Sequence, residues 1–370
     1  MTSTFYDELK RHALERPDHP AIMDAAGALS YSQFLDQVER FAGGLGTLPL
    51  TAHSKLGLMC LNQREFLIAL LGAFLKGLPI VPYNYLLTPE DLAFITEDAG
   101  VDLILTHPMF VKPEAVPFFS QFKVRLVTGP EPGLAGFDAR PWPAFLQQGQ
   151  TGGGRHRREP GIPDVILYTS GTTAQPKGVM LNENQFFANT TGVGAHLEFL
   201  PEDRGIMALP LFHSFGNIIA LVFLRAGSTL ILIPQFQPKT ILAAITEHRA
   251  TVLPLVPTIY SFLVQLYERG GYDVSSLRYC VSGGAALPQA LFHHVERTLG
   301  CTVLEGYGLT ETSPVIAVNT MAQGSVPGSV GPVLPNLQVR IVNADGAAVA
   351  PGEVGEIVVQ GETVMSGYWN

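Results

Sequence analysis

The sequence predicts an α/β protein in which two α/β subdomains with largely parallel sheets pack together, followed by a small β-rich subdomain. Three observations point to this fold. Short apolar runs alternate with helical stretches through residues 30–106 and again through residues 206–299, a pattern typical of parallel strands joined by helices. After about Ser325 the strands instead alternate apolar and polar residues. The chain of 370 residues is also too long for one ordinary core, which suggests two or three subdomains.

The first α/β subdomain is expected over residues 1–160. Ser30 and Gln33 form a capping-box pattern, and the apolar residues that follow share one helical face. Thr88 and Pro89 likewise open a helix. Further elements are expected as strands at 55–61, 79–82 and 101–106 and as a helix at 65–76. The glycine-rich basic stretch 151–160 is interpreted as an exposed loop, in preference to an RNA- or membrane-binding patch.

The second α/β subdomain is expected over residues 161–324 and the β-rich one, as a distorted barrel, over 325–370. In the second subdomain, strands are predicted at 206–210, 229–234, 251–256 and 277–282, and helices at 240–248, 257–268 and 288–299. In the third, strands 337–342 and 355–360 are joined through the turn signal Asn343–Gly346.

Composition limits the classes of function. Hydrophobic residues make up 46% of the chain and charged residues 15%, which indicates large buried cores. The net charge of −9 argues against nucleic acid as the main partner. Three cysteines without metal-ligand spacing fit a reducing compartment, and the apolar runs 66–75 and 218–224 are too short to span a bilayer. We therefore expect a soluble cytoplasmic protein with no transmembrane segment.

A turn rich in hydroxyls and glycine follows the apolar run 165–168 and is expected to lead from a strand into a helix. Glycines let backbone N–H groups converge on an anion, while hydroxyls and a lysine add donors and charge. The turn is not a Walker loop, because Pro176 stands where that pattern needs glycine. An ordinary loop remains the alternative. The candidate phosphate-binding residues are Thr169, Ser170, Gly171, Thr172, Thr173 and Lys177.

Two further segments contain small residues next to candidate ligand-binding positions. In residues 304–312, Gly306 and Gly308 flank Tyr307, which suggests a flat ligand close to the backbone, and Glu311 offers the hard oxygen that Mg²⁺ prefers. A strand end with a solvated glutamate is the alternative. In residues 281–288, a strand runs into small residues and then a helix, which fits either a ligand lying on backbone or tight packing.

A lone histidine, His213, lies among apolar residues in segment 208–216. Such a histidine is more often a satisfied core group than a catalyst. The segment contains no aspartate or glutamate.

These segments resemble the motifs of the adenylate-forming, or AMP-binding, superfamily. The string YTSGTTAQPKGVM resembles its phosphate-loop signature, and residues 307–311 match its Tyr-Gly-x-Thr-Glu motif. Residues 281–288 and 208–216 resemble its adenine-binding and acid-binding segments, and residues 352–370 resemble a Gly-Glu-(Ile/Leu)…Met-x-Gly-Tyr segment that we interpret as structural. The motifs stand in the family's order and the likeness covers about residues 5–370.

The resemblance implies a role for each candidate residue. The phosphate-loop residues would hold the β- and γ-phosphates of ATP, Thr310 would contact the α-phosphate, and Glu311 would bind Mg²⁺. His213 would orient the carboxylate of the substrate. The family has glycine where this chain has Ala174, which bears on the shape of the loop and on ATP affinity. The residues implied to bind adenine or to line the nucleotide and acyl sites are Gly283, Gly284, Ala285, Glu305, Gly306, Tyr307 and Gly308.

The activity implied is that of an ATP-dependent acid–thiol ligase with ATP, Mg²⁺ and coenzyme A. Strings LPLFHSFG and LEGYGLTETSP look most like those of fatty acyl-CoA synthetases, and the acid is expected to be fatty or aryl. Five apolar residues, Phe212, Phe215, Ile218, Val256 and Ile259, are expected to surround its tail. Transfer to an acyl carrier protein, a catalytically silent nucleotide- or acyl-binding module, and a homodimer stay open.

Residues that the family carries beyond this segment are not found in the sequence. They are a Thr-Gly-Asp motif for the ribose, a hinge, and a C-terminal lid domain with a lysine that stabilises the transition state. The resemblance therefore implies an N-terminal domain with weak turnover, because losing a cation aimed at developing charge commonly costs about 100-fold or more in rate.

Overall fold

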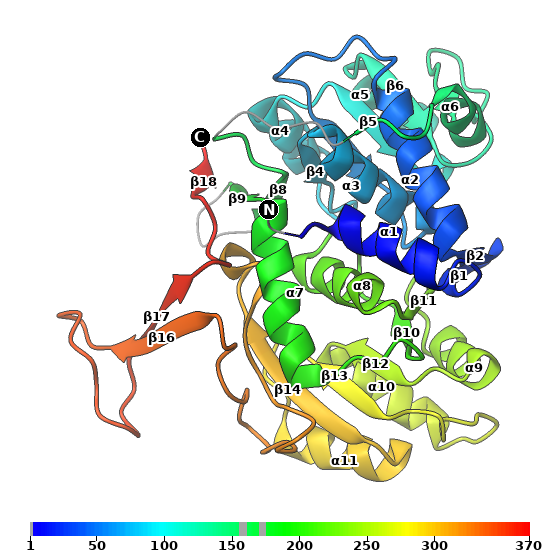
Figure 1. The fold of residues 1–370 in the computed structure, drawn as a ribbon. Coiled ribbons are helices and arrows are strands. Elements are labelled where there is room, and N and C mark those ends of the chain that lie inside the picture. The colour runs from blue at the N-terminus through cyan, green and yellow to red at the C-terminus, as the bar shows by residue number, and fades with distance from the viewer. Residues whose placement is uncertain (1–2, 155–160, 170–174) are drawn as a thin grey trace.

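The computed structural model describes residues 3–154, 161–169 and 175–370. Two eight-stranded, mostly parallel sheets lie one above the other, and a two-stranded ribbon projects from them (Figure 1). This arrangement confirms the predicted α/β class with two packed sheets and a small antiparallel element.

The first sheet has the strand order β18-β9-β8-β4-β3-β5-β6-β7. Only β9 and β18 run antiparallel to their neighbours. Its strands are β3 (Leu56–Met59), β4 (Ile80–Pro82), β5 (Leu103–Thr106), β6 (Val124–Val127), β7 (Arg140–Pro141), β8 (Val165–Thr169), β9 (Lys177–Leu181) and β18 (Tyr368–Trp369).

The second sheet has the strand order β15-β14-β13-β12-β10-β11-β1-β2, with antiparallel pairs only at its two edges. Its strands are β1 (Pro20–Asp24), β2 (Gly27–Ser30), β10 (Arg204–Met207), β11 (Thr229–Leu232), β12 (Val252–Leu255), β13 (Tyr279–Ser282), β14 (Thr302–Gly308) and β15 (Val315–Val318).

Helices fill the space between the sheets and cover both outer faces. One apolar core joins the inner faces, and its helices are α1 (Phe5–Glu15), α2 (Tyr31–Leu45), α3 (Arg64–Lys76), α7 (Glu183–Leu197) and α8 (Ser214–Ala226). A second core packs α4 (Pro89–Ala99) and α5 (Val116–Ser120) on the first sheet. A third packs α9 (Pro238–His248), α10 (Pro257–Tyr267) and α11 (Gln289–Leu299) on the second. The short helix α6 (Trp142–Gln148) packs against α2.

The local signals in the sequence produce the expected helix ends. Ser30 accepts from the backbone N–H of Gln33, and Gln33 accepts from that of Ser30, so the predicted capping box starts α2. The Thr88 hydroxyl caps α4 by accepting from the backbone N–H of Asp91. Helix α3 ends at Gly77, whose φ of 74° is left-handed and suits a residue without a side chain.

The sheets do not follow the sequence ranges expected for the subdomains. Strands β1 and β2 come from the first range but complete the second sheet, while β8 and β9 come from the second range but belong to the first sheet. Pairing between Ile22 of β1 and Leu230 of β11 shows how the chain crosses over. The subdomain boundaries themselves stay a prediction.

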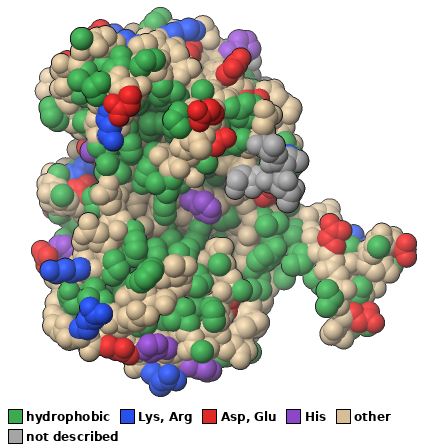
Figure 2. All heavy atoms as spheres, turned by 180° about the vertical axis from the view of Figure 1, so that it is seen from behind, with side chains coloured by type: hydrophobic (Ala, Val, Ile, Leu, Met, Phe, Trp, Pro, Cys, Tyr) green, Lys and Arg blue, Asp and Glu red, His purple; other side chains and the backbone are tan. Residues whose placement is uncertain are grey.

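The expected barrel in residues 325–370 is a two-stranded ribbon of β16 (Leu337–Val342) and β17 (Glu356–Gly361), while β18 joins the first sheet. The predicted turn forms, with Gly346 N–H donating to Asn343 at 3.0 Å. It does not lead directly into β17, because Ala348 first pairs back beside Val342. Seen from behind, the projecting ribbon of β16, β17 and their connection carries exposed hydrophobic side chains (Figure 2), among them Val354, Ile357 and Val358.

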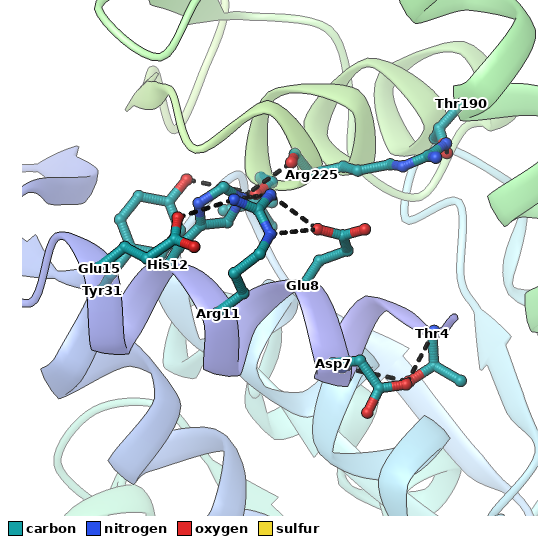
Figure 3. A network of polar contacts seen from close by, with 10 residues as sticks. Thr4, Asp7, Glu8, Arg11, His12, Glu15, Tyr31, Thr190 and Arg225 are labelled. Atoms are coloured by element: carbon teal, nitrogen blue, oxygen red, sulfur yellow. Dashed lines mark hydrogen bonds and ion pairs between the residues drawn. The ribbon is translucent and has the colours of Figure 1, made fainter. Parts of the chain in front are cut away.

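A hydrogen bond joins α1 to α8 (Figure 3), and another joins α2 to the segment just after α8. Nε2 of the buried His12 lies 2.8 Å from the carbonyl oxygen of Arg225, the penultimate residue of α8. A carbonyl can only accept, so this nitrogen carries the hydrogen. The Tyr31 hydroxyl of α2 donates to the Ser228 carbonyl at 2.8 Å. These contacts fix the N-terminal helix in the layer between the sheets.

No helix in the part of the chain that the structure describes has both the length and the apolar character needed to cross a membrane. The apolar runs at 66–75 and 218–224 are buried in α3 and α8, as predicted.

Candidate nucleotide and acyl site

The candidate site lies where β13 and β14 end beside the N-terminus of α8. Parallel strands carry their ligand-binding loops at their carboxyl ends. Strand β13 runs directly into Gly283, and β14 contains Gly306 and Gly308 near its end. A cavity forms there. Its lining consists of Val193, Leu197, His213, Ser214, Phe215, Ile219, Val281, Ser282, Gly283, Gly284, Gly306, Tyr307, Gly308, Pro314, Val315 and Val318.

Two glycines of the cavity wall leave little room for a side chain or adopt a backbone conformation that favours glycine. A Cβ on Gly283 would lie 3.1 Å from the ring of Phe215, so even a methyl group would press on the cavity wall. Gly284 has a φ of 78°, which side-chain-bearing residues rarely adopt. Both glycines therefore keep backbone exposed to the cavity.

The candidate phosphate loop is flanked by two paired strands. Thr169 ends β8 and Lys177 begins β9, and the two residues face each other in the antiparallel register. The expected helix after this loop is therefore wrong: the chain continues as strand β9, and α7 starts only at Glu183. The predicted site residues Ser170, Gly171, Thr172 and Thr173, and also Ala174, lie outside the described residues.

The candidate metal-binding segment forms a 3₁₀ turn over Thr310–Thr312. The Thr310 hydroxyl lies 3.2 Å from the hydroxyl of Ser214, the first residue of α8 and part of the cavity wall. Glu311 accepts a hydrogen bond from the Tyr368 hydroxyl at 2.9 Å, and the ring centroid of that tyrosine lies 5.6 Å from Nζ of Lys177. This chain of contacts links the candidate phosphate lysine to the cavity.

His213 caps the N-terminus of α8 and lines the cavity. Its Nδ1 accepts from the backbone N–H of Phe215 at 3.4 Å, which leaves the hydrogen of the neutral ring on Nε2. Burial lowers the pKa of His213, so the imidazole is neutral at neutral pH. A neutral ring can donate one hydrogen bond to a substrate carboxylate without titrating.

Of the seven residues implied to bind adenine or to line the nucleotide and acyl sites, two do not line this cavity. Glu305 is buried and its Oε1 accepts from the backbone N–H of Leu287 at 3.0 Å, while Oε2 has no hydrogen-bond partner among the described residues. Ala285 is exposed on the loop after β13. By contrast, Gly283, Gly284, Gly306, Tyr307 and Gly308 all lie in the wall as expected.

Mg²⁺ fits the described residues only as a partner of a nucleotide. No group of three or more histidine, cysteine, aspartate or glutamate side chains gathers in the ranges that the structure describes. Mg²⁺ is usually held by one or two carboxylates together with substrate phosphates and water. Glu311 can serve as such a carboxylate.

The apolar wall differs from the expected one. Of the five residues expected around the acid's tail, only Phe215 lines the cavity. The sequence did not predict that Val193 and Leu197 of α7 line the cavity, because that helix was not identified from the sequence. The signal was present: Asn182 and Gln185 form a reciprocal capping box at its start. The sequence also did not predict Ser214 and Tyr368 as neighbours of Thr310 and Glu311.

The fold and these motifs define an adenylate-forming enzyme. Residues 9–369 match the AMP-binding enzyme family, and the chain belongs to that family.

Among curated relatives, the chain is similar to indoleacetate–CoA ligase of Aromatoleum aromaticum, at 32% identity over 98% of this chain and 71% of the relative. It is also similar to long-chain-fatty-acid–CoA ligase of Bacillus subtilis, at 30% identity over 99% of this chain and 70% of the relative. Among solved structures, apo MatB from Rhodopseudomonas palustris shares 28% identity with a TM-score of 0.86, covering 100% of this chain and 72% of that one. The anthranilate CoA ligase AuaEII in complex with anthranoyl-AMP superimposes with a TM-score of 0.89 at 23% identity, over 99% of this chain and 70% of that one, and shows the shared fold.

Proposed function

We propose that the protein takes part in the ATP-dependent activation of a carboxylic acid with an uncharged, mainly apolar tail, and in its transfer to coenzyme A. The observation that carries this proposal is the contact chain from Lys177 through Tyr368 and Glu311 to Thr310, and on through Ser214 to the cavity. Membership in the AMP-binding family supports it, as do relatives named as CoA ligases.

In the first step, an oxygen of the acid attacks the α-phosphorus of ATP, and the bond to pyrophosphate breaks. Lys177 and Thr169 would hold the phosphates, Thr310 would donate to the α-phosphate, and the His213 Nε2–H would orient the acid. Mg²⁺, when bound, neutralises phosphate charge. Catalysis of this kind rests on positioning and charge stabilisation, with little covalent work by the protein.

In the second step, the sulfur of coenzyme A attacks the carbonyl carbon of the acyl-adenylate. A thioester forms and AMP leaves. Coenzyme A is proposed as acceptor because the curated relatives cited above are CoA ligases. The nucleotide would lie with its adenine beside Tyr307 and the backbone of Gly283 and Gly284, and the acid's tail in the cavity.

The cavity constrains the acid. Its wall contains no aspartate, glutamate, lysine or arginine among the described residues, and its histidine is neutral at neutral pH. Burying a charged tail there would leave that charge unpaired, which is costly. Fatty and aryl acids therefore suit the site better than acids with a second charge. A cytoplasmic location and a homodimer stay predictions.

Calorimetry with ATP, AMP and a stable fatty- or aryl-acyl-adenylate analogue tests the proposal. We expect all three to bind, and the acyl-adenylate analogue to bind most tightly because it fills both the nucleotide site and the cavity. Acid-dependent exchange of labelled pyrophosphate into ATP measures the first step. If none of the three ligands bound, the nucleotide site would be wrong; binding without any exchange would favour a catalytically silent module.

A further inference from the structure

Residues 363–369, which we call the strap, lie between strand β9 and the 310–313 turn. On one side, Met180 of β9 donates to Gly367 and accepts from Ser366, both at 3.0 Å. On the other side, Met365 N–H donates to the Glu311 carbonyl oxygen at 2.8 Å, and the Ser313 hydroxyl donates to the Thr363 carbonyl oxygen at 2.8 Å. The strap thus ties the strand that begins with Lys177 to the turn that carries Glu311.

Gly178 allows the strap to lie this close to β9. It pairs with Trp369, and a Cβ at this position would lie 3.1 Å from the Trp369 Cβ and 2.8 Å from a methyl carbon of Ile166. Such distances are shorter than ordinary carbon contacts of about 3.5–4.0 Å. The indole N–H of Trp369 is held in turn by the Asp98 carbonyl oxygen at 2.9 Å. The backbone around residue 368 is therefore anchored independently of the Tyr368 side chain.

The Tyr368 side chain contacts both charged residues. Its hydroxyl donates to Oε1 of Glu311 at 2.9 Å, and its ring attracts the Lys177 ammonium 5.6 Å from the centroid. Tyr368 is 45% exposed, so its apolar burial is modest and its contacts are chiefly polar.

We propose that Tyr368 is a positioning residue of the nucleotide site. Its hydroxyl fixes one oxygen of Glu311, and because a carboxylate has two oxygens, the other is left to serve Mg²⁺ on the bound nucleotide. Its ring holds the Lys177 ammonium beside the same turn. This inference rests on the proposed function, and it gives a role in the site to a segment that the sequence suggested was only structural.

The test compares ATP binding in Mg²⁺ with ATP binding in EDTA, by calorimetry, for the wild type and for Tyr368→Phe. The phenylalanine ring remains over Lys177, so affinity in EDTA should stay within about twofold. The gain in affinity on adding Mg²⁺ should fall about three- to tenfold, the loss expected for one hydrogen bond to a charged group near the surface. The melting temperature of each variant shows that it is folded.

Tyr6→Phe is the matched control. Tyr6 also donates to a glutamate, Glu39, at 2.7 Å, but on α1 and α2. This control should leave binding unchanged under both conditions. Glu311→Gln alone should abolish most of the Mg²⁺ gain, and adding Tyr368→Phe to it should cause no further loss if the tyrosine acts through Glu311.

An unchanged Mg²⁺ gain in Tyr368→Phe, or equal losses in Mg²⁺ and in EDTA, would overturn the inference while leaving the proposed function intact. Failure of the wild type to bind ATP in Mg²⁺ at all would overturn the proposed function itself.

Discussion

Replacing Gly283 with alanine should narrow the acyl cavity more than the adenine site beside it, because the new Cβ would point at the Phe215 ring. The new Cβ would lie 3.1–3.5 Å from three atoms of the Phe215 ring, whereas carbon atoms ordinarily pack at about 3.5–4.0 Å. The φ of Gly283 is not in the left-handed region, so the backbone accepts a side chain. The ring must give way by a few tenths of an ångström, and overpacking of this size typically costs about 1–3 kcal/mol.

The assay is calorimetric titration with AMP and with acyl-adenylate analogues of increasing tail size. Taking the lower end of that cost, about 1 kcal/mol, affinity for the bulkiest tails should fall about fivefold. Affinity for AMP should change less than twofold, because AMP has no tail. Gly194→Ala provides the control, since its Cβ on α7 would meet nothing within 4 Å. Equal losses for AMP and for every tail would refute this description of the cavity.

Three further predictions concern other parts of the molecule. Lys177→Ala should weaken ATP binding about tenfold and AMP binding little, because AMP lacks the β- and γ-phosphates. Replacing the exposed Lys239 with alanine should change neither affinity. Calorimetry measures the binding of both nucleotides. Burial lowers the pKa of His12 below the value of about 6.5 for a free imidazole. The unfolded state therefore binds more protons than the folded state, and the free energy of unfolding should fall as pH drops below about 6.5. Denaturant unfolding between pH 7 and 5 should show a shallower decline for His12→Gln; an identical decline would contradict this reasoning. Arg278→Ala should destabilise by about 2–4 kcal/mol in thermal or denaturant unfolding, because it leaves the buried Asp203 carboxylate without its ion pair at 2.6 Å. Arg249→Ala, which breaks an exposed pair, should cost about 1 kcal/mol or less.

Local features were predictable from the sequence because they depend on neighbours along the chain. The capping box at Ser30 and the cap at Thr88 form as expected, and α3 ends at Lys76 as the predicted helix does. The same holds for the glycines after β13 and within β14 that line the cavity. Each of these depends on spacing within a few residues, which the sequence displays directly.

Features that depend on distant pairing were not predictable. Tyr368 meets Glu311 across 57 residues, and no spacing rule relates them. The sheets exchange strands between the expected subdomains because pairing partners in parallel sheets are chosen by tertiary packing, not by order in the chain. The prediction of a helix after the phosphate loop was wrong for the same reason. Residues Lys177–Leu181 are apolar enough to form a helix or a strand, and their pairing with β8 makes them a strand.

The exchange of strands also governs how the protein can be divided. A fragment starting at residue 161 would lack β1 and β2, and the backbone groups of β11 that pair with β1 would face solvent. Unpaired edges of that kind recruit other chains and promote aggregation. During synthesis, the N-terminal hairpin must likewise wait for Leu230 to leave the ribosome before it finds its partner. Until then, the edge of β1 that pairs with β11 in the folded protein stays unpaired.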